Sequence, residues 1–176
     1  MKKTILTFGL IAGAIQGILM LILMGLFSPG ADAKSGELIG YATMILSLSM
    51  IFFGIRSYRN NQPGGAITFG KAFKLGLLIA LIAAALYVII WLLYYYFGDG
   101  KSLMDAYFNQ AVEQIRQSGE PAQAIEQKVK EMEKFKEIYK NPIAVTGFTF
   151  LENFPVGLVI ALISAALLRR QPQAQP

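Results

Sequence analysis

Four long runs of apolar residues, separated by polar segments, dominate the chain and predict its fold. A helix needs about 20 predominantly apolar residues to cross a hydrocarbon core about 30 Å thick. The runs occupy residues 5–27, 38–55, 75–97 and 143–168, and each approaches or exceeds that length. We therefore expect an all-α integral membrane protein in which four spanning helices form a bundle, as one membrane domain over residues 1–176.

Polar residues at the ends of the runs predict helix boundaries. Thr68 is placed to cap a helix that begins near Phe69 and leads into the third span. A turn is expected over residues 28–37, before the second span. Within that turn Ala31-Asp32-Ala33 resembles a signal-peptide cleavage site, but the first apolar run is longer than the about 7 to 15 residues of a signal h-region. This length favours a retained span.

Residues 99–141 carry a different pattern, with charged side chains at nearly every turn. Apolar residues recur there in two stripes at helical spacing, which predicts two amphipathic helices. The stripes consist of Met104, Tyr107, Phe108, Ala111 and Ile115, and of Ile125, Val129, Met132, Phe135 and Tyr139. Ser102 and Asp105 match a capping box at the start of the first helix. We expect a helical hairpin between the third and fourth spans, its apolar faces closing on each other or lying on the membrane.

A basic turn between the second and third spans orients the chain. Loops rich in Lys and Arg stay on the cytoplasmic side of a membrane. With alternating spans, the cytoplasmic segments hold eight cations and no anion: Lys2, Lys3, Arg56, Arg59, Lys71, Lys74, Arg169 and Arg170. Ten of the eleven acids fall on the other side. We therefore predict cytoplasmic termini and an extracytoplasmic hairpin.

The four cations of the turn, Arg56, Arg59, Lys71 and Lys74, are also candidates for contact with anionic lipid headgroups. Each Lys or Arg near such a surface contributes about 1 kcal/mol. The alternative is that these side chains serve only as the topological signal expected of any multi-pass protein. Both interpretations predict membrane lipids as partners of the chain.

Composition narrows the function. Only 15% of the residues are charged, whereas a soluble domain carries about 25%. The chain has no Cys and no His, which excludes disulfides, Cys or His metal sites and Ser-His-Asp catalysis. No pair of carboxylates within the spans offers acid–base chemistry. We expect no enzymatic activity, no cofactor and no metal. The formal charge of +5 lies beside the membrane, so it does not indicate a nucleic-acid partner.

Three stretches resemble a known family. They read YATMILSLSMIFFGIRSYRNN over residues 41–61, GGAITFGKAFKLGLLIA over residues 64–80 and FPVGLVIALISAALLRR over residues 154–170. In these the chain is similar to small bacterial multi-pass proteins grouped as domain-of-unknown-function family 4199. The resemblance implies a four-helix protein of the bacterial cytoplasmic membrane. It brings no activity, substrate or catalytic residue.

Glu152 is the only acid inside an expected span, and it is followed by Asn153. A carboxylate at the centre of a spanning helix costs about 2.5 to 3.5 kcal/mol on insertion scales, so an intramembrane acid suggests function. Sixteen residues separate Glu152 from the inner end at Leu168, which places it about 6 Å inside the outer edge of the core. We interpret Glu152 and Asn153 either as a proton or ion site or as a structural, interfacial pair.

Gly9, Gly13 and Gly17 form two successive small-xxx-small spacings on the first span, and Gly25 lies further along. Such glycines let another helix approach closely in lipid. The partner is either another span of the same chain or the first span of a second copy.

These patterns favour a non-enzymatic scaffold or accessory protein whose external hairpin engages another protein or lipid. The alternative is a small oligomeric proton- or cation-coupled transporter or channel that uses Glu152. Expected protein partners are a second copy of the chain or an unknown membrane protein.

Overall fold

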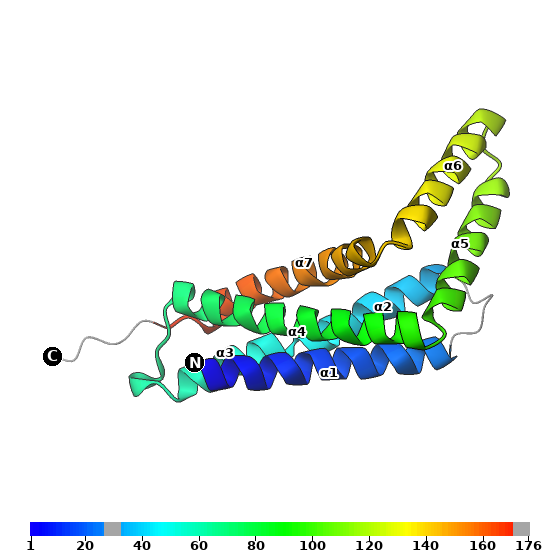
Figure 1. The fold of residues 1–176 in the computed structure, drawn as a ribbon. Coiled ribbons are helices and arrows are strands. Elements are labelled where there is room, and N and C mark those ends of the chain that lie inside the picture. The colour runs from blue at the N-terminus through cyan, green and yellow to red at the C-terminus, as the bar shows by residue number, and fades with distance from the viewer. Residues whose placement is uncertain (27–32, 171–176) are drawn as a thin grey trace.

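The structure is a computed structural model that describes residues 1–26 and 33–170 (Figure 1). Its helices are α1 Lys2–Leu26, α2 Ala33–Leu48, α3 Met50–Asn60, α4 Phe69–Phe97, α5 Gly100–Arg116, α6 Ala122–Tyr139 and α7 Pro142–Leu168, with a 3-10 turn at Pro63–Gly65. The described ranges contain no β-strand. The all-α prediction is therefore confirmed.

Four helical segments are long and apolar enough to cross a membrane: Lys2–Gly25, Leu38–Asn60, Phe69–Phe97 and Pro142–Leu168. They lie side by side as a bundle in which α4 packs along both α1 and α7, while α3 contacts α1 and α7 from the other side (Figure 1). Helices α5 and α6 project from the end of the bundle where α4 ends and α7 begins.

The second span differs from the continuous helix expected over residues 38–55. Its helix begins at Ala33, is interrupted at Ser49 and continues to Asn60. The Ser47 hydroxyl donates to the Thr43 carbonyl oxygen (2.7 Å), and the Ser49 hydroxyl donates to the Leu46 carbonyl oxygen (2.6 Å). Such back-bonding bends helices, which accounts for the break. Residues 28–32 of the predicted turn, with Ala31 and Asp32 of the cleavage-like motif, lie outside the described residues, and the turn is wrong for residues 33–37, which form the start of α2.

The start of α4 agrees with the sequence-based prediction, whereas the start of α5 differs from it. The Thr68 hydroxyl oxygen accepts the Lys71 amide N–H (3.4 Å) and caps α4 at the predicted position. The capping box at Ser102 is wrong, because α5 already begins at Gly100 and Ser102 lies inside it. A Cβ at Gly100 would stand 2.5 Å from the Tyr95 Cα. Glycine therefore permits a turn from α4 into α5 that is tighter than the pattern indicated.

Helices α5 and α6 close much of their apolar surface on each other. The rings of Phe108 and Phe135 lie 5.9 Å apart, and Lys136 pairs with Asp105 at 2.8 Å. Tyr107, expected on the inner stripe, is instead 54% exposed. The inward stripe is thus narrower than the sequence suggested.

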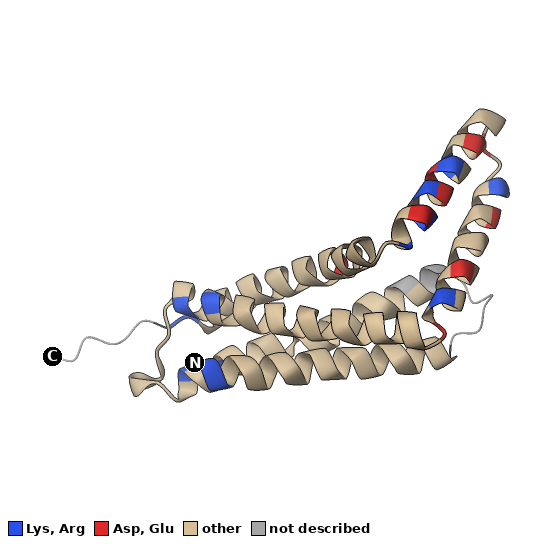
Figure 2. Cartoon of the chain, viewed as in Figure 1, with Lys and Arg blue, Asp and Glu red and all other residues tan. Residues whose placement is uncertain are grey.

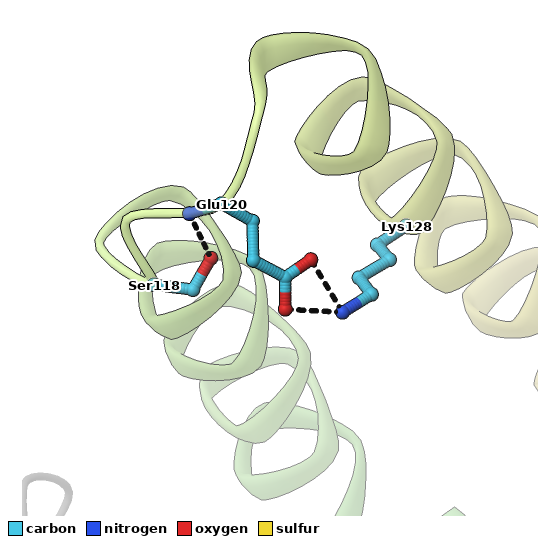
Figure 3. A network of polar contacts seen from close by, with 3 residues as sticks. All are labelled: Ser118, Glu120 and Lys128. Carbon is cyan, nitrogen blue, oxygen red and sulfur yellow. Dashed lines mark hydrogen bonds and ion pairs between the residues drawn. The ribbon is translucent and has the colours of Figure 1, made fainter.

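The connection between these two helices is fixed by polar contacts (Figure 3). Gly119 has a φ of +73°, a left-handed conformation that glycine adopts without strain. The Glu120 carboxylate pairs with Lys128 at 2.5 Å, and the Glu120 N–H donates to the Ser118 hydroxyl at 3.5 Å. Exposed ion pairs of this kind contribute about 0 to 1 kcal/mol, so they set the direction of the turn more than its stability.

Aromatic rings join the base of α5 and α6 to the bundle. Tyr139 of α6 stands at the centre, with its ring 5.9 Å from Tyr95 of α4, 5.8 Å from Phe108 of α5 and 6.3 Å from Phe148 of α7. Aromatic pairs at such separations add about 0.5 to 1.5 kcal/mol each beyond their buried area. The base of the α5–α6 pair is therefore packed against the bundle and not merely tethered to it.

Candidate functional site

A polar layer crosses the interior of the bundle between two apolar clusters. On α1, Ala12 belongs to the larger cluster and Met20 to the smaller one, and the buried Gln16 lies between them. On α7, Val145 belongs to the smaller cluster, and the buried Asn153 lies towards the larger one. We define the polar layer by four buried polar side chains that together span about two helical turns along the bundle: Gln16, Ser47, Thr149 and Asn153.

Close glycine contacts fix the height of Asn153 in the bundle. A Cβ on Gly157 of α7 would lie 2.9 Å from the Cβ of Ala80 on α4 and 3.9 Å from Leu48 of α2. Asn153 precedes Gly157 by one helical turn. Because α7 runs opposite to α4 and parallel to α2, Asn153 lies at the level of Ala84 on α4 and Met44 on α2.

The same argument places Gln16 of α1. A Cβ on Gly13 would lie 2.9 Å from the Leu86 Cβ of α4, and Gly17 lies against Ile90. Gln16 therefore stands between the levels of Leu86 and Ile90. Compared with Asn153, it is about one turn, roughly 5 Å, nearer the α5 end of the bundle.

The two amides of the layer are buried without partners. Gln16 is 4% exposed and Asn153 is fully buried. Within the part of the chain that the structure describes, neither the amide nitrogen nor the amide oxygen of either residue has a hydrogen-bond partner. Leaving a buried donor or acceptor unpaired costs about 1 to 3 kcal/mol. These groups can therefore bind a ligand that both donates and accepts hydrogen bonds.

The hydroxyl members of the layer are satisfied within their own helices. Ser47 donates to the Thr43 carbonyl oxygen at 2.7 Å, and Thr149 donates to the Val145 carbonyl oxygen at 2.8 Å. Each hydroxyl oxygen keeps lone pairs that can accept a further hydrogen bond. Among residues 1–26 and 33–170, no three His, Cys, Asp or Glu side chains gather in an arrangement that could hold a metal ion.

The structure separates Glu152 from Asn153. Successive residues of an α-helix point about 100° apart. Asn153 faces the interior of the bundle, whereas Glu152 is exposed on the outside of α7. Burial raises the pKa of the Tyr139 phenol to about 12, and the negative charge of Glu152 adds to this shift. The Glu152 and Asn153 side chains therefore face different sides of α7.

The glycine face of α1 packs against α4 of the same chain. A Cβ on Gly9 would lie 2.7 Å from the Ile82 Cβ, and one on Gly13 would lie 2.9 Å from the Ala83 carbonyl oxygen. Gly17 lies against Ile90, whereas Gly25 has no neighbour within 4 Å of its Cβ position. In the structure Gly9, Gly13 and Gly17 therefore lie against α4 of the same chain, and Gly25 does not belong to this contact.

The predicted basic residues gather at one end of the bundle (Figure 2). Arg56, Lys71 and Lys74 are exposed there, and Arg59 reaches the Leu168 carbonyl oxygen of α7 at 3.5 Å. Lys71 also lies 5.3 Å from the centre of the Tyr58 ring. The backbones of Ile67 and Arg170 exchange hydrogen bonds of 3.0 and 2.9 Å at the same end. Charges of both signs occupy α5 and α6 at the other end.

Residues 7–170 match the model of the family described as protein of unknown function (DUF4199). The chain belongs to the DUF4199 family. The match covers the polar layer, the basic end and the α5–α6 pair. No curated protein and no solved structure matches the chain. Membership in DUF4199 therefore identifies relatives of this chain without supplying an activity.

Gln16, Ser47 and Thr149 are the site residues that the sequence analysis did not single out, and Gln16 is the one with an unpaired amide. One signal could have found it, because Gln16 carries the only amide side chain among residues 5–27, where Thr7 is the one other polar residue. A polar residue in a spanning helix usually faces the interior of its bundle. The burial of its amide beside an apolar cluster follows that rule.

Proposed function

We propose that the protein is a non-enzymatic scaffold or accessory protein of the bacterial cytoplasmic membrane, and that its α5–α6 pair binds a partner protein on the extracytoplasmic side. The distribution of charge supports this orientation. One end of the bundle carries Lys and Arg without acids, whereas the end with α5 and α6 carries charges of both signs and nearly all of the acids (Figure 2). Since cytoplasmic loops retain Lys and Arg, the end that carries α5 and α6 faces outwards.

The observation that carries the proposal is the fixed projection of two polar helices from an apolar bundle (Figure 1). The 17 residues of α5 and 18 residues of α6 make helices about 25 to 27 Å long. Their base is packed through Tyr139 against Tyr95 and Phe148. A rigidly held surface loses less conformational entropy on binding than a flexible loop does.

An open groove of about 1130 Å³ between α5 and α6 supplies the surface that we assign to the partner. Phe108, Val112 and Ile138 give it an apolar part, and Arg116 and Glu137 are among its charged residues. Both signs of charge occur along it, so it suits a segment that also carries both signs together with apolar side chains. Complementary charge of this kind selects partners and sets their register.

Site-specific photo-crosslinking in intact cells tests the assignment. A photoreactive side chain at Asn109 or Lys134 lies in the groove, whereas Tyr107 and Lys128 lie outside its lining and provide exposed control positions. We expect one discrete adduct from the groove positions and none from the controls. Equal adducts from all four positions, or no discrete adduct from the groove, would contradict the proposal.

A second candidate function is the oligomeric proton- or cation-coupled transporter or channel that uses Glu152. The polar layer on the inner side of the same helix is the observation in its favour, since polar groups inside membrane bundles mark ion and substrate paths. The packing of Gly9, Gly13 and Gly17 against α4 removes one way of forming the oligomer. Flux measurements in proteoliposomes distinguish the two functions. Proton or cation flux that is lost in Glu152→Gln supports transport, and no flux in the unchanged protein supports the scaffold.

A further inference from the structure

The interior of a membrane bundle is the costliest place for an unpaired amide. Lipid cannot replace the hydrogen bonds that water would supply. Gln16 and Asn153 present four such atoms, two donors and two acceptors, within about one helical turn along the bundle. The burial of both residues excludes the explanation that their side chains reach outside solvent.

The chemistry of these atoms selects the ligand. A bare cation pairs with the amide oxygens and leaves the NH₂ groups unpaired, and an anion does the reverse. None of the four layer residues carries a charge that would offset the desolvation of an ion. Water donates and accepts equally, and buried waters in proteins typically make about three hydrogen bonds to groups left otherwise unsatisfied.

We propose that the polar layer is a binding site for internal water, in which water hydrogen-bonds the amides of Gln16 and Asn153 inside the membrane-spanning bundle. The Ser47 and Thr149 hydroxyl oxygens, each about one helical turn from Asn153 along the bundle, are further acceptors. This inference does not depend on the scaffold function proposed above.

The surroundings of the layer fit this ligand. On α4, the positions that face the layer include Ala83 and Ala84, both fully buried, which project only a methyl group into the interior. The interruption of the second span at Ser49 lies two residues from Ser47 and five residues, about 7.5 Å, from the level of Met44 and Asn153. Backbone groups freed by a break in a membrane-spanning helix are satisfied by neighbouring Ser or Thr side chains or by ordered water.

Hydroxyl-radical footprinting by X-ray radiolysis of the full chain in nanodiscs tests the site. Radiolysis makes radicals from bound water in place, so a buried methionine is oxidised only when water is beside it. Met44 is 5% exposed and lies at the level of Asn153, which makes it the natural reporter. Leu75→Met provides the matched control, because Leu75 is fully buried in the larger apolar cluster.

We expect Met44 to be oxidised faster than the methionine introduced by Leu75→Met. We also expect Asn153→Leu to reduce the oxidation of Met44 to the control rate. Equal rates for Met44 and the control, or a Met44 rate unchanged by Asn153→Leu, would overturn the proposal.

Nuclear magnetic resonance of the unchanged protein gives a second measurement that requires no variant to fold. Side-chain NH₂ signals of Gln16 and Asn153 should show magnetisation transfer from water, as expected for amides that bind it. Amide signals without any transfer from water would show a dry layer and refute the inference.

Discussion

A methyl group added to Gly13 tests how closely α1 and α4 must approach. In Gly13→Ala the new Cβ would lie 2.9 Å from both the Ala83 carbonyl oxygen and the Leu86 Cβ. One of these neighbours is backbone, so relief requires α1 to move away from α4. Overpacking of this kind typically costs about 1 to 3 kcal/mol. The change also gains about 1 kcal/mol of helix propensity, which hides part of the loss.

Gly147→Ala is the matched control that separates the two contributions. Gly147 lies within α7 and has no neighbour within 4 Å of its Cβ position. It therefore gains the same helix propensity of about 1 kcal/mol without a clash. The difference in unfolding free energy between the two variants isolates the packing cost, and we expect Gly13→Ala to be about 1 to 3 kcal/mol less stable than Gly147→Ala.

Thermal unfolding in detergent, followed by the fluorescence of Trp91, measures this difference. For a chain of about this size each kcal/mol shifts Tm by about 2 to 4 °C, so we expect a separation of about 2 to 12 °C. Size-exclusion profiles should be alike for both variants, because the Gly13 contact lies within one chain. Equal Tm values, or a Gly13→Ala variant that changes oligomeric state, would refute the packing argument.

Three further predictions use other parts of the molecule. Cysteines introduced at Asn61 and Gln127 should react with an impermeant reagent from opposite faces of the membrane. Labelling of both positions from the same face would refute the proposed topology. Asn141 accepts the Ile143 amide N–H and caps α7, so Asn141→Ala should cost about 0.5 to 2 kcal/mol in chemical unfolding, whereas Ser102→Ala should cost almost none because Ser102 caps nothing. Burial raises the pKa of Tyr139 from 10.0 to about 12, so its neutral form stabilises the fold below pH 10 and that contribution is lost as pH rises towards 12. The unfolding free energy of Tyr139→Phe should therefore fall less than that of the unchanged protein between pH 9 and 12. If the two proteins lose stability in parallel over this range, ionisation of Tyr139 is not the cause of the loss.

Hydropathy and capping residues determined most of the fold. Four apolar runs are sufficient to predict helices because lipid leaves the backbone no partner outside its own helix. Thr68 caps α4 in the way that its position predicts, because such a cap needs only residues three positions apart. These features follow from residues close together in the chain, and sequence periodicity therefore finds them.

The interruption at Ser49, the early start of α5 and the identity of the site depended on tertiary structure. Pattern alone could not choose between the two faces of α7, which place Asn153 inside and Glu152 outside. It also could not relate Gln16 to Asn153, which are far apart in the chain and lie on helices α1 and α7. Their levels follow from how closely glycines let the neighbouring helices pack. Sequence fixes which segments enter the membrane because each helix satisfies its own backbone, but the rotation and depth of each helix depend on contacts that other helices supply.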